Sequence, residues 1–179
     1  VGSEMCIRDS LETETLLTRQ GDTHCATRFA PNSTFKWPLS LMAFNEGVIT
    51  QDTVFSWDGQ QRARSVWNQD QTPYTWLQHS VVWVSQQVTP LLGLSTIQHY
   101  LSAFGYGNQD FSGGLDKAWL SDSLQISPDE QLQFMIQFLK ERLPLNQDAT
   151  KATKANLWVA PSLFGKTGSS GLLPVSYTH

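Results

Sequence analysis

A capping sequence at residues 127–130 is the feature that most restricts how this chain can fold. It reads Ser127-Pro128-Asp129-Glu130: a serine N-cap, a proline at the first helical position, and a glutamate placed to bond back to the cap. It predicts a helix that starts after Ser127 and ends near Pro144. The side chains expected to be buried on this helix are Leu132, Met135, Ile136 and Leu139.

Further helices are predicted wherever apolar residues recur every three or four positions. They cover about 33–46, 81–92 and 94–104, with a helical turn at 75–78 and a weaker helix at 147–156. The residues expected to be buried are Phe35, Leu39, Met42 and Ala43 on the first helix, and Ile97, Leu101 and Phe104 on the third. One or two strands are visible, at 13–17 and 162–167. The chain is therefore helix-rich, with a loop of four glycines at 105–114.

Composition excludes several classes of protein. The 179 residues suit one domain or a large piece of one, and 40% apolar residues with 11% aromatics can form a globular core. Twelve Lys and Arg against sixteen Asp and Glu give a net charge of −4, without the basic excess of a nucleic-acid-binding protein. No apolar run approaches the ~18–20 residues of a membrane span. We expect neither a nucleic-acid partner nor a membrane span in this chain.

The cysteines and histidines argue against a metal centre. Two cysteines, Cys6 and Cys25, are too few for a disulfide framework. The four histidines stand alone in the sequence, with no His-x-x-x-His pair and no cysteine at metal-ligand spacing. The sequence therefore predicts no bound metal.

Ser33-Thr34-Phe35-Lys36 is the first motif that could carry chemistry. A serine at the start of a helix and a lysine three residues later lie on one face of that helix. The helix amides and the positive end of the dipole favour an anion that develops at the serine. Burial would disfavour the ammonium form of the lysine and so make it a base. Alone, the motif is also what an N-cap serine followed by a surface lysine produces.

Three later motifs follow this one in a specific order. Ser80-Val81-Val82 begins an apolar helix, so a hydroxyl group lies at a helix start beside a valine that can exclude water. Tyr106-Gly107-Asn108 lies in the glycine-rich loop. Lys166-Thr167-Gly168 ends the strand predicted at 162–167 and places a cation, a hydroxyl group and a glycine side by side. Each could be an N-cap, a turn or a strand end, but together they are specific.

This order resembles the class D β-lactamases, the oxacillinase type of serine β-lactamase. The Ser-x-x-Lys, Ser-x-Val, Tyr-Gly-Asn and Lys-Thr-Gly signatures are all present, and the likeness extends over about 23–169, including 81–87, 106–113 and 118–128. The resemblance implies an α+β fold, the serine β-lactamase and penicillin-binding transpeptidase-like fold. That fold has a helical subdomain beside a five-stranded antiparallel sheet, and most of the sheet strands are expected to be missing here.

The resemblance implies a nucleophile and a base at the first motif. Ser33 would open the lactam and become acylated, and Lys36 would be a carboxylated lysine (N6-carboxylysine) that acts as general base. Phe35 and Val82 would keep this pocket apolar, and Trp119 would donate its indole hydrogen to the carbamate. No cofactor is implied apart from the carbon dioxide or bicarbonate that carboxylates the lysine.

The remaining roles come from the other motifs. Ser80 would relay a proton to the leaving nitrogen, and Lys166 would supply positive potential. The backbone amides of Ser33 and Ser169 would form the oxyanion hole. The substrate-binding residues implied are Thr167, Gly168, Ser169, Tyr106 and Asn108. Of these, Thr167 would bond to the substrate carboxylate, while Tyr106 and Asn108 are expected to shape their loop rather than take part in the chemistry.

The two ends of the chain differ from its middle. Residues 1–10 and 172–179 resemble translated sequencing-adapter read-through, so we expect two non-native tails around a partial catalytic domain at 11–171. Residues 1–10 lack the layout of a secretion signal, whereas the full-length parent is expected in the periplasm or outside the cell. The strand with Lys166 and Thr167 is expected to lack a neighbour on at least one side. The fragment alone should therefore be unstable and inactive.

Two other functions fit part of the pattern. The sensor domain of a β-lactam-responsive receptor shares three of the motifs and is acylated without turnover. A penicillin-binding transpeptidase usually has Ser-x-Asn where this chain has Ser80-Val81-Val82. If the chain is an enzyme, its substrate is expected to be a small-molecule β-lactam. The sequence does not indicate which class of β-lactam is cleaved.

Overall fold

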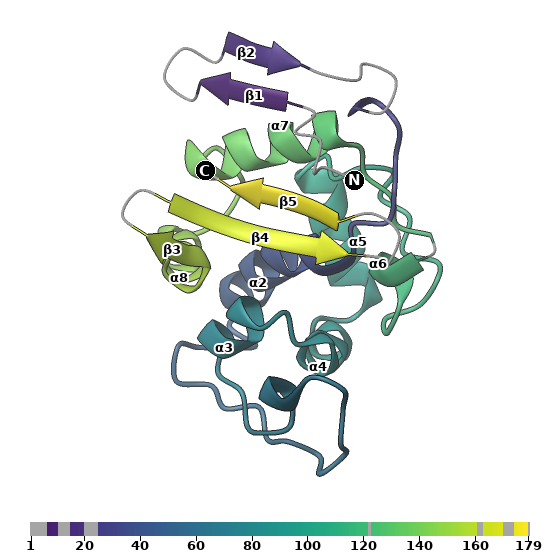
Figure 1. The fold of residues 1–179 in the computed structure, drawn as a ribbon, viewed down its shortest axis with the longest axis vertical. Helices are drawn as coiled ribbons and strands as arrows, with labels where there is room; N and C mark the ends of the chain where they lie inside the picture. The colour runs from purple at the N-terminus through teal and green to yellow at the C-terminus, as the bar shows by residue number, and fades with distance from the viewer. Residues whose placement is uncertain are drawn as a thin grey trace.

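The computed structural model describes residues 7–10, 15–19, 25–121, 123–160, 163–169 and 174–178. Helices form most of the molecule, and the strands lie along one side of them (Figure 1). The α-helices are α2 (Lys36–Asn45), α3 (Pro73–Gln78), α4 (Val82–Leu92), α5 (Leu94–Ala103), α6 (Ala118–Ser121), α7 (Pro128–Leu139) and α8 (Gln147–Leu157). Two short 3₁₀ helices, η1 (Asn32–Phe35) and η2 (Ser65–Trp67), precede α2 and α3.

The strands form two small antiparallel sheets. One pairs β1 (Ile7–Ser10) with β2 (Thr15–Arg19), and the other has the order β3 (Trp158–Ala160), β4 (Leu163–Ser169), β5 (Pro174–Thr178). β4 pairs with β5 from Gly165 to Ser169, but with β3 only at Leu163 and Phe164. Among the described residues, Lys166 and Thr167 therefore have a paired strand on the β5 side alone, which agrees with the expectation of a missing neighbour on at least one side. β3 was not predicted, because its three residues are too few to show the alternation of apolar and polar side chains that indicates a strand. β1 and β5 lie in the segments that the sequence analysis set apart as tails.

The capping box at the start of α7 forms as predicted. The Ser127 Oγ accepts a hydrogen bond from the Glu130 amide at 3.3 Å, and the Glu130 carboxylate accepts one from the Ser127 amide at 2.9 Å. The predicted buried face is only partly right. Met135 and Ile136 are buried, but Leu132 and Leu139 are half-buried.

Two phenylalanines set the true buried face of α7. Phe134 and Phe138 lie four residues apart and pack edge-on against Trp37, with ring centroids 6.4 and 5.3 Å away. Burying these large rings turns the helix so that Gln131 is buried as well. The helix ends at Leu139, before the predicted end near Pro144.

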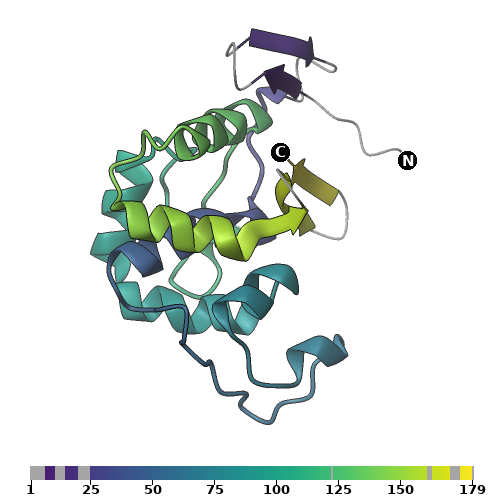
Figure 2. The same ribbon diagram turned by 90° about the vertical axis from the view of Figure 1, so that its left-hand side faces the viewer.

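α2 lies at the centre of the hydrophobic core. Every residue from Lys36 to Ala43 is buried, which includes three of the four side chains predicted for this helix, and the fourth, Phe35, is buried in η1. α2 packs against α4 and against α8, which lies alongside it in Figure 2. One polar contact joins α2 to α8: the Ser40 hydroxyl donates to Thr153 Oγ1 at 3.0 Å.

α4 and α5 follow the predicted boundaries closely. Gly93 has a φ of 77° and separates the two helices, and Pro90 is accommodated in the last turn of α4. Ile97, Leu101 and Phe104 are buried as predicted. Within the described ranges, no helix combines the length and apolarity that crossing a bilayer requires.

Candidate active site

The structure brings Ser33 and Lys36 together at the junction of η1 and α2. Lys36 Nζ donates a hydrogen bond to Ser33 Oγ at 3.2 Å. The turn is also held by the buried Thr34, whose hydroxyl donates to the Pro31 carbonyl at 2.7 Å. Ser33 remains partly exposed, whereas Lys36 is fully buried. A partly exposed hydroxyl group therefore contacts a lysine nitrogen that is closed to solvent.

Burial of Lys36 decides what its side chain can do. A charged ammonium in an apolar interior is disfavoured, and loss of its proton removes that cost. A neutral amine can accept the Ser33 proton or react with carbon dioxide. The turn is therefore suited to activating the Ser33 hydroxyl group.

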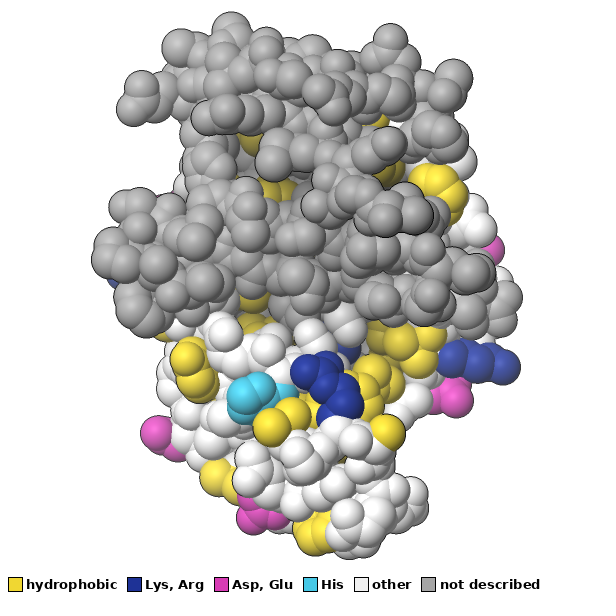
Figure 3. Space-filling view, in the orientation of Figure 1, with side chains coloured by type: hydrophobic (Ala, Val, Ile, Leu, Met, Phe, Trp, Pro, Cys, Tyr) yellow, Lys and Arg dark blue, Asp and Glu magenta, His cyan; other side chains and the backbone are white. Residues whose placement is uncertain are grey.

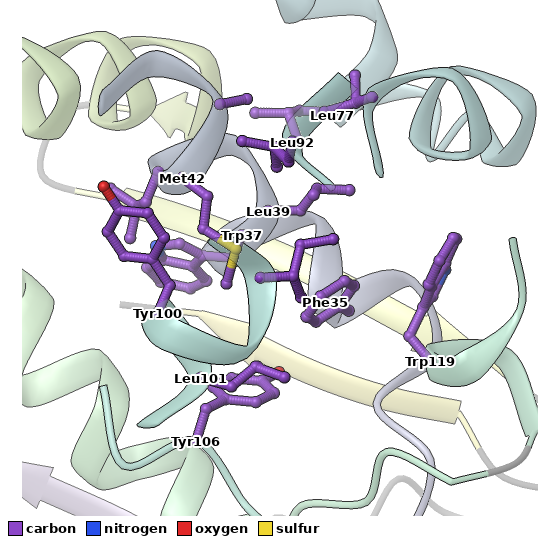
Figure 4. Packing of buried hydrophobic residues seen from close by; sticks show 14 of the residues in the cluster. Phe35, Trp37, Leu39, Met42, Leu77, Leu92, Tyr100, Leu101, Tyr106 and Trp119 are labelled. Atoms are coloured by element: carbon purple, nitrogen blue, oxygen red, sulfur yellow. The ribbon is translucent and has the colours of Figure 1, made fainter. Parts of the chain in front are cut away.

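An aromatic cluster covers the inner side of this turn. Phe35 stacks on Trp119 with centroids 5.6 Å apart and also contacts Tyr106 (Figure 4). Phe111 is a further ring in contact with Phe35. Trp119 lies on α6, which packs against η1. Phe111 lies in a segment that resembles the family, 106–113, but the sequence assigned it no role at the site. The cluster makes the surroundings of the Ser33 turn apolar.

The Trp119 indole N–H has no hydrogen-bond partner among the described residues, although it is buried. An unpaired buried donor costs about 1–3 kcal/mol. Such a donor beside the Ser33–Lys36 turn fits an acceptor that the described residues do not supply. A carboxyl group added to a lysine nitrogen would be one such acceptor.

Ser80 lies in the tight turn between α3 and α4. Its φ of 55° is left-handed, a conformation that serine rarely adopts. The next residue, Val81, is fully buried, and its amide donates to the Trp76 carbonyl at 3.0 Å. Val82, the first residue of α4, is half-buried. α4 packs on α2, the helix that begins with Lys36.

The Lys-Thr-Gly motif lies on β4, whose backbone packs against η1. Lys166 pairs with Tyr177 and Thr167 pairs with Ser176 across to β5, and Gly168 and Ser169 complete the strand. The predicted oxyanion-hole residues, Ser33 and Ser169, therefore come from two elements that pack together.

The Tyr-Gly-Asn motif forms a clamp inside the molecule. The Asn108 side chain accepts from the Gln125 amide at 2.9 Å and donates to the Ser123 carbonyl at 2.7 Å. Tyr106 is fully buried, and its hydroxyl donates to Gln131 at 3.0 Å. These contacts hold the segment between α6 and α7 in place.

Gly107 allows this clamp to close. Its φ is 56°, and a Cβ atom there would lie 2.0 Å from the Gln125 carbonyl oxygen. Only glycine fits so close an approach of two backbone segments.

An ion pair ties the chain before η1 to the start of α7. Arg28 Nε donates to the Glu130 carboxylate at 3.0 Å. This hydrogen bond raises the pKa of Arg28 and lowers the pKa of Glu130. The pair was not predictable, because its partners are 102 residues apart. In the part of the chain that the structure describes, no three His, Cys, Asp or Glu side chains gather as a metal site requires.

Comparison with known proteins gives consistent matches. Residues 11–157 match the family described as the penicillin binding protein transpeptidase domain. Beta-lactamase OXA-1 of Escherichia coli is 47% identical over 156 residues, which are 81% of this chain and 56% of that protein. Regulatory protein BlaR1 of Bacillus licheniformis is 38% identical over 149 residues, which are 80% of this chain and 25% of that protein.

Solved structures extend the likeness to the fold. A class D β-lactamase from Bacillus subtilis superposes with a TM-score of 0.86 at 30% identity, covering 90% of this chain and 70% of that one. The chain spans just over half the length of OXA-1.

Proposed function

Since the chain belongs to the class D β-lactamases, with their penicillin-binding transpeptidase fold, we propose that the whole protein hydrolyses β-lactams through an acyl-enzyme on Ser33. The observation that carries the proposal is the 3.2 Å hydrogen bond between a partly exposed serine and a fully buried lysine. Ser33 Oγ attacks the lactam carbonyl, the C–N bond breaks, and the nitrogen takes a proton. Water then cleaves the ester and frees Ser33.

We propose that Lys36 is carboxylated on Nζ. The carbamate, formed from carbon dioxide, supplies the general base for both half-reactions. The buried position of Lys36 favours the neutral amine that carbon dioxide needs. The unpaired indole N–H of Trp119 and the apolar rings around Phe35 support the modification, because a carbamate is retained where a donor meets it away from water.

The other motifs are proposed to hold the substrate. Backbone amides of Ser33 and Ser169 would bind the oxyanion, and Thr167 would bond to the substrate carboxylate next to the positive charge of Lys166. Ser80 would pass a proton to the leaving nitrogen. The packing of β4 against η1 supports this arrangement. As in the parent predicted from the sequence, the site of action would be the periplasm or the cell exterior.

Mass spectrometry tests the nucleophile. The complete protein is mixed with a penicillin, and the intact mass should increase by the mass of the penicillin. Ser33→Ala should abolish the adduct, while Ser102→Ala, a change at an exposed serine on α5, should leave it unchanged. An adduct that persists in Ser33→Ala contradicts the assignment.

Bicarbonate dependence tests the carbamate. Activity should fall in buffer freed of carbon dioxide and return on adding bicarbonate. Trp119→Phe, which keeps a ring but loses the N–H, should raise the bicarbonate concentration needed and slow deacylation more than acylation. Trp37→Phe is the matched control, because Trp37 is a second buried indole without a partner in the described ranges. Full activity without carbon dioxide would overturn this part of the proposal.

A second function has one observation in its favour. The match to BlaR1 covers 80% of this chain, so a sensor domain that is acylated and not turned over fits the same residues. The rate of deacylation separates the two: an enzyme releases the penicilloyl group within the assay, and a sensor keeps it.

A further inference from the structure

The turn that holds Ser80 is fixed by a separate loop, residues 55–71. This loop leaves the helical part at the bottom of Figure 1 and returns to it. Reciprocal backbone hydrogen bonds between Phe55 and Gln71, 2.8 and 2.9 Å long, close its base. Its second half contains η2, which carries Trp67.

Two side chains of the loop donate to the same carbonyl, that of His79. Trp67 Nε1 donates at 2.9 Å and Arg64 Nη1 donates at 3.1 Å. The Arg64 guanidinium also lies over the Trp67 ring, 5.4 Å from its centroid. Figure 3 shows a histidine and basic side chains grouped with hydrophobic ones on this face of the molecule.

The His79 carbonyl belongs to the peptide group that sets the backbone of Ser80. A peptide group is planar, so the orientation of the His79 carbonyl also sets the orientation of the Ser80 N–H. The φ torsion of Ser80 is measured from this same peptide plane. At the C-terminus of α3 this carbonyl has left the helical ladder and needs outside donors. Ser80 holds a left-handed φ of 55°, which persists only where the surroundings enforce it.

Trp67 also contacts the helix on the other side of Ser80. Its carbonyl accepts a hydrogen bond from Trp83 Nε1 at 3.0 Å, and Trp83 lies in the first turn of α4. One residue therefore bonds to the end of α3 and to the start of α4, the two elements that flank Ser80.

We propose that Trp67 and Arg64 are positioning residues for the reaction, because they clamp the His79 carbonyl and so aim the Ser80 hydroxyl. The inference rests on the proposed function, in which Ser80 passes a proton to the leaving nitrogen. It assigns loop 55–71 a task in acylation that none of the sequence motifs indicates.

Removal of one of the two donors to the His79 carbonyl tests the proposal in the complete protein. Trp67→Phe keeps an aromatic ring and deletes the N–H. Trp57→Phe is the matched control, because Trp57 Nε1 donates at 3.0 Å to the Gln60 carbonyl within the same loop and does not contact His79. At saturating penicillin, Trp67→Phe should slow acylation of Ser33 about 10- to 100-fold, as misplaced catalytic groups do. Trp57→Phe should acylate at the wild-type rate, and both variants should melt at similar temperatures.

Hydrogen exchange gives a second readout that needs no activity. The Ser80 and Val81 amides should exchange about 10-fold faster in Trp67→Phe than in the wild type, and should not change in Trp57→Phe. If neither the exchange rates nor the acylation rate changes in Trp67→Phe, the positioning role of Trp67 is wrong, and the proposed function is unaffected. A wild-type protein that penicillin does not acylate overturns the proposed function, and the exchange rates still decide whether Trp67 holds Ser80.

Discussion

The Ser33–Lys36 turn and loop 55–71 are held in place by opposite means. The turn rests on buried rings, and Phe35 alone contacts three other aromatic side chains. The loop rests on polar side chains that bond to its own backbone, such as Asn68, which donates to the Arg62 carbonyl and accepts from the Arg62 amide. Packing contributes much free energy, whereas partly exposed hydrogen bonds contribute little but fix direction. The comparison predicts that the stability of the protein depends mainly on the turn, whereas the orientation of the Ser80 hydroxyl depends on the loop.

The largest expected effect comes from emptying the aromatic cluster. Phe35→Ala should lower the free energy of unfolding by about 3–5 kcal/mol, because it removes a fully buried ring and leaves a cavity. Urea unfolding of the complete protein measures the loss. Leu91→Ala, a change at an exposed apolar residue, should be close to neutral. A Phe35→Ala variant as stable as Leu91→Ala would mean that packing does not hold the turn.

A smaller loss should follow from opening the Asn108 clamp. Gly107→Ala introduces a methyl group against the Gln125 carbonyl and should cost about 2–4 kcal/mol through strain and displaced backbone. Gly105→Ala is the matched variant, because Gly105 also has a positive φ of 59° but open space around it. It should cost only the left-handed backbone penalty of about 1–2 kcal/mol. Equal melting temperatures for the two variants would exclude the clash.

The Arg28–Glu130 pair should make stability depend on pH. The folded pKa of Glu130 is lowered, so the carboxylate binds protons less readily in the folded state than in the unfolded state. Its contribution is complete above the unfolded value of about 4.3 and is lost as the pH falls through the lower folded value. Glu130→Gln should cost about 0.5–1 kcal/mol at neutral pH and flatten the melting temperature between pH 5 and about 3. A pH profile unchanged by the substitution would show that the pair is not the cause.

The smallest expected effect concerns an exposed pair in the loop. The Arg62 guanidinium holds the pKa of Asp58 at about 2. Carboxyl titration by NMR should show this midpoint, and Arg62→Gln should raise it toward the ordinary value near 3.9. The melting temperature should not change measurably, since exposed ion pairs are screened by water and salt. A clear drop in melting temperature would show that polar contacts stabilise the loop more than the comparison allows.

Local signals explain which parts of the fold could be predicted. The Ser127 cap and Gly93 act within one helical turn, so the start of α7 and the end of α4 were predicted close to their real positions. β3 and the burial of Phe134 and Phe138 on α7 were missed because they depend on partners elsewhere, such as Trp37 against Phe138.

The same distinction applies to the site. Spacing along one helix predicted the contact between Ser33 and Lys36. The donors to His79 could not be predicted, because they lie 12 and 15 residues away along the path of an irregular loop. A tryptophan and an arginine without a motif carry no chemical signal of their own.

The central place of α2 has a consequence for synthesis on the ribosome. Its partner Thr153 follows Ser40 by 113 residues, a delay of roughly 6–23 s at about 5–20 residues per second. Until α8 emerges, a ten-residue helix with buried-type residues on every side has no complete groove to occupy. The Ser33–Lys36 turn is thus synthesised well before the helix that completes the packing around α2, and the nascent chain keeps these apolar side chains uncovered during that interval.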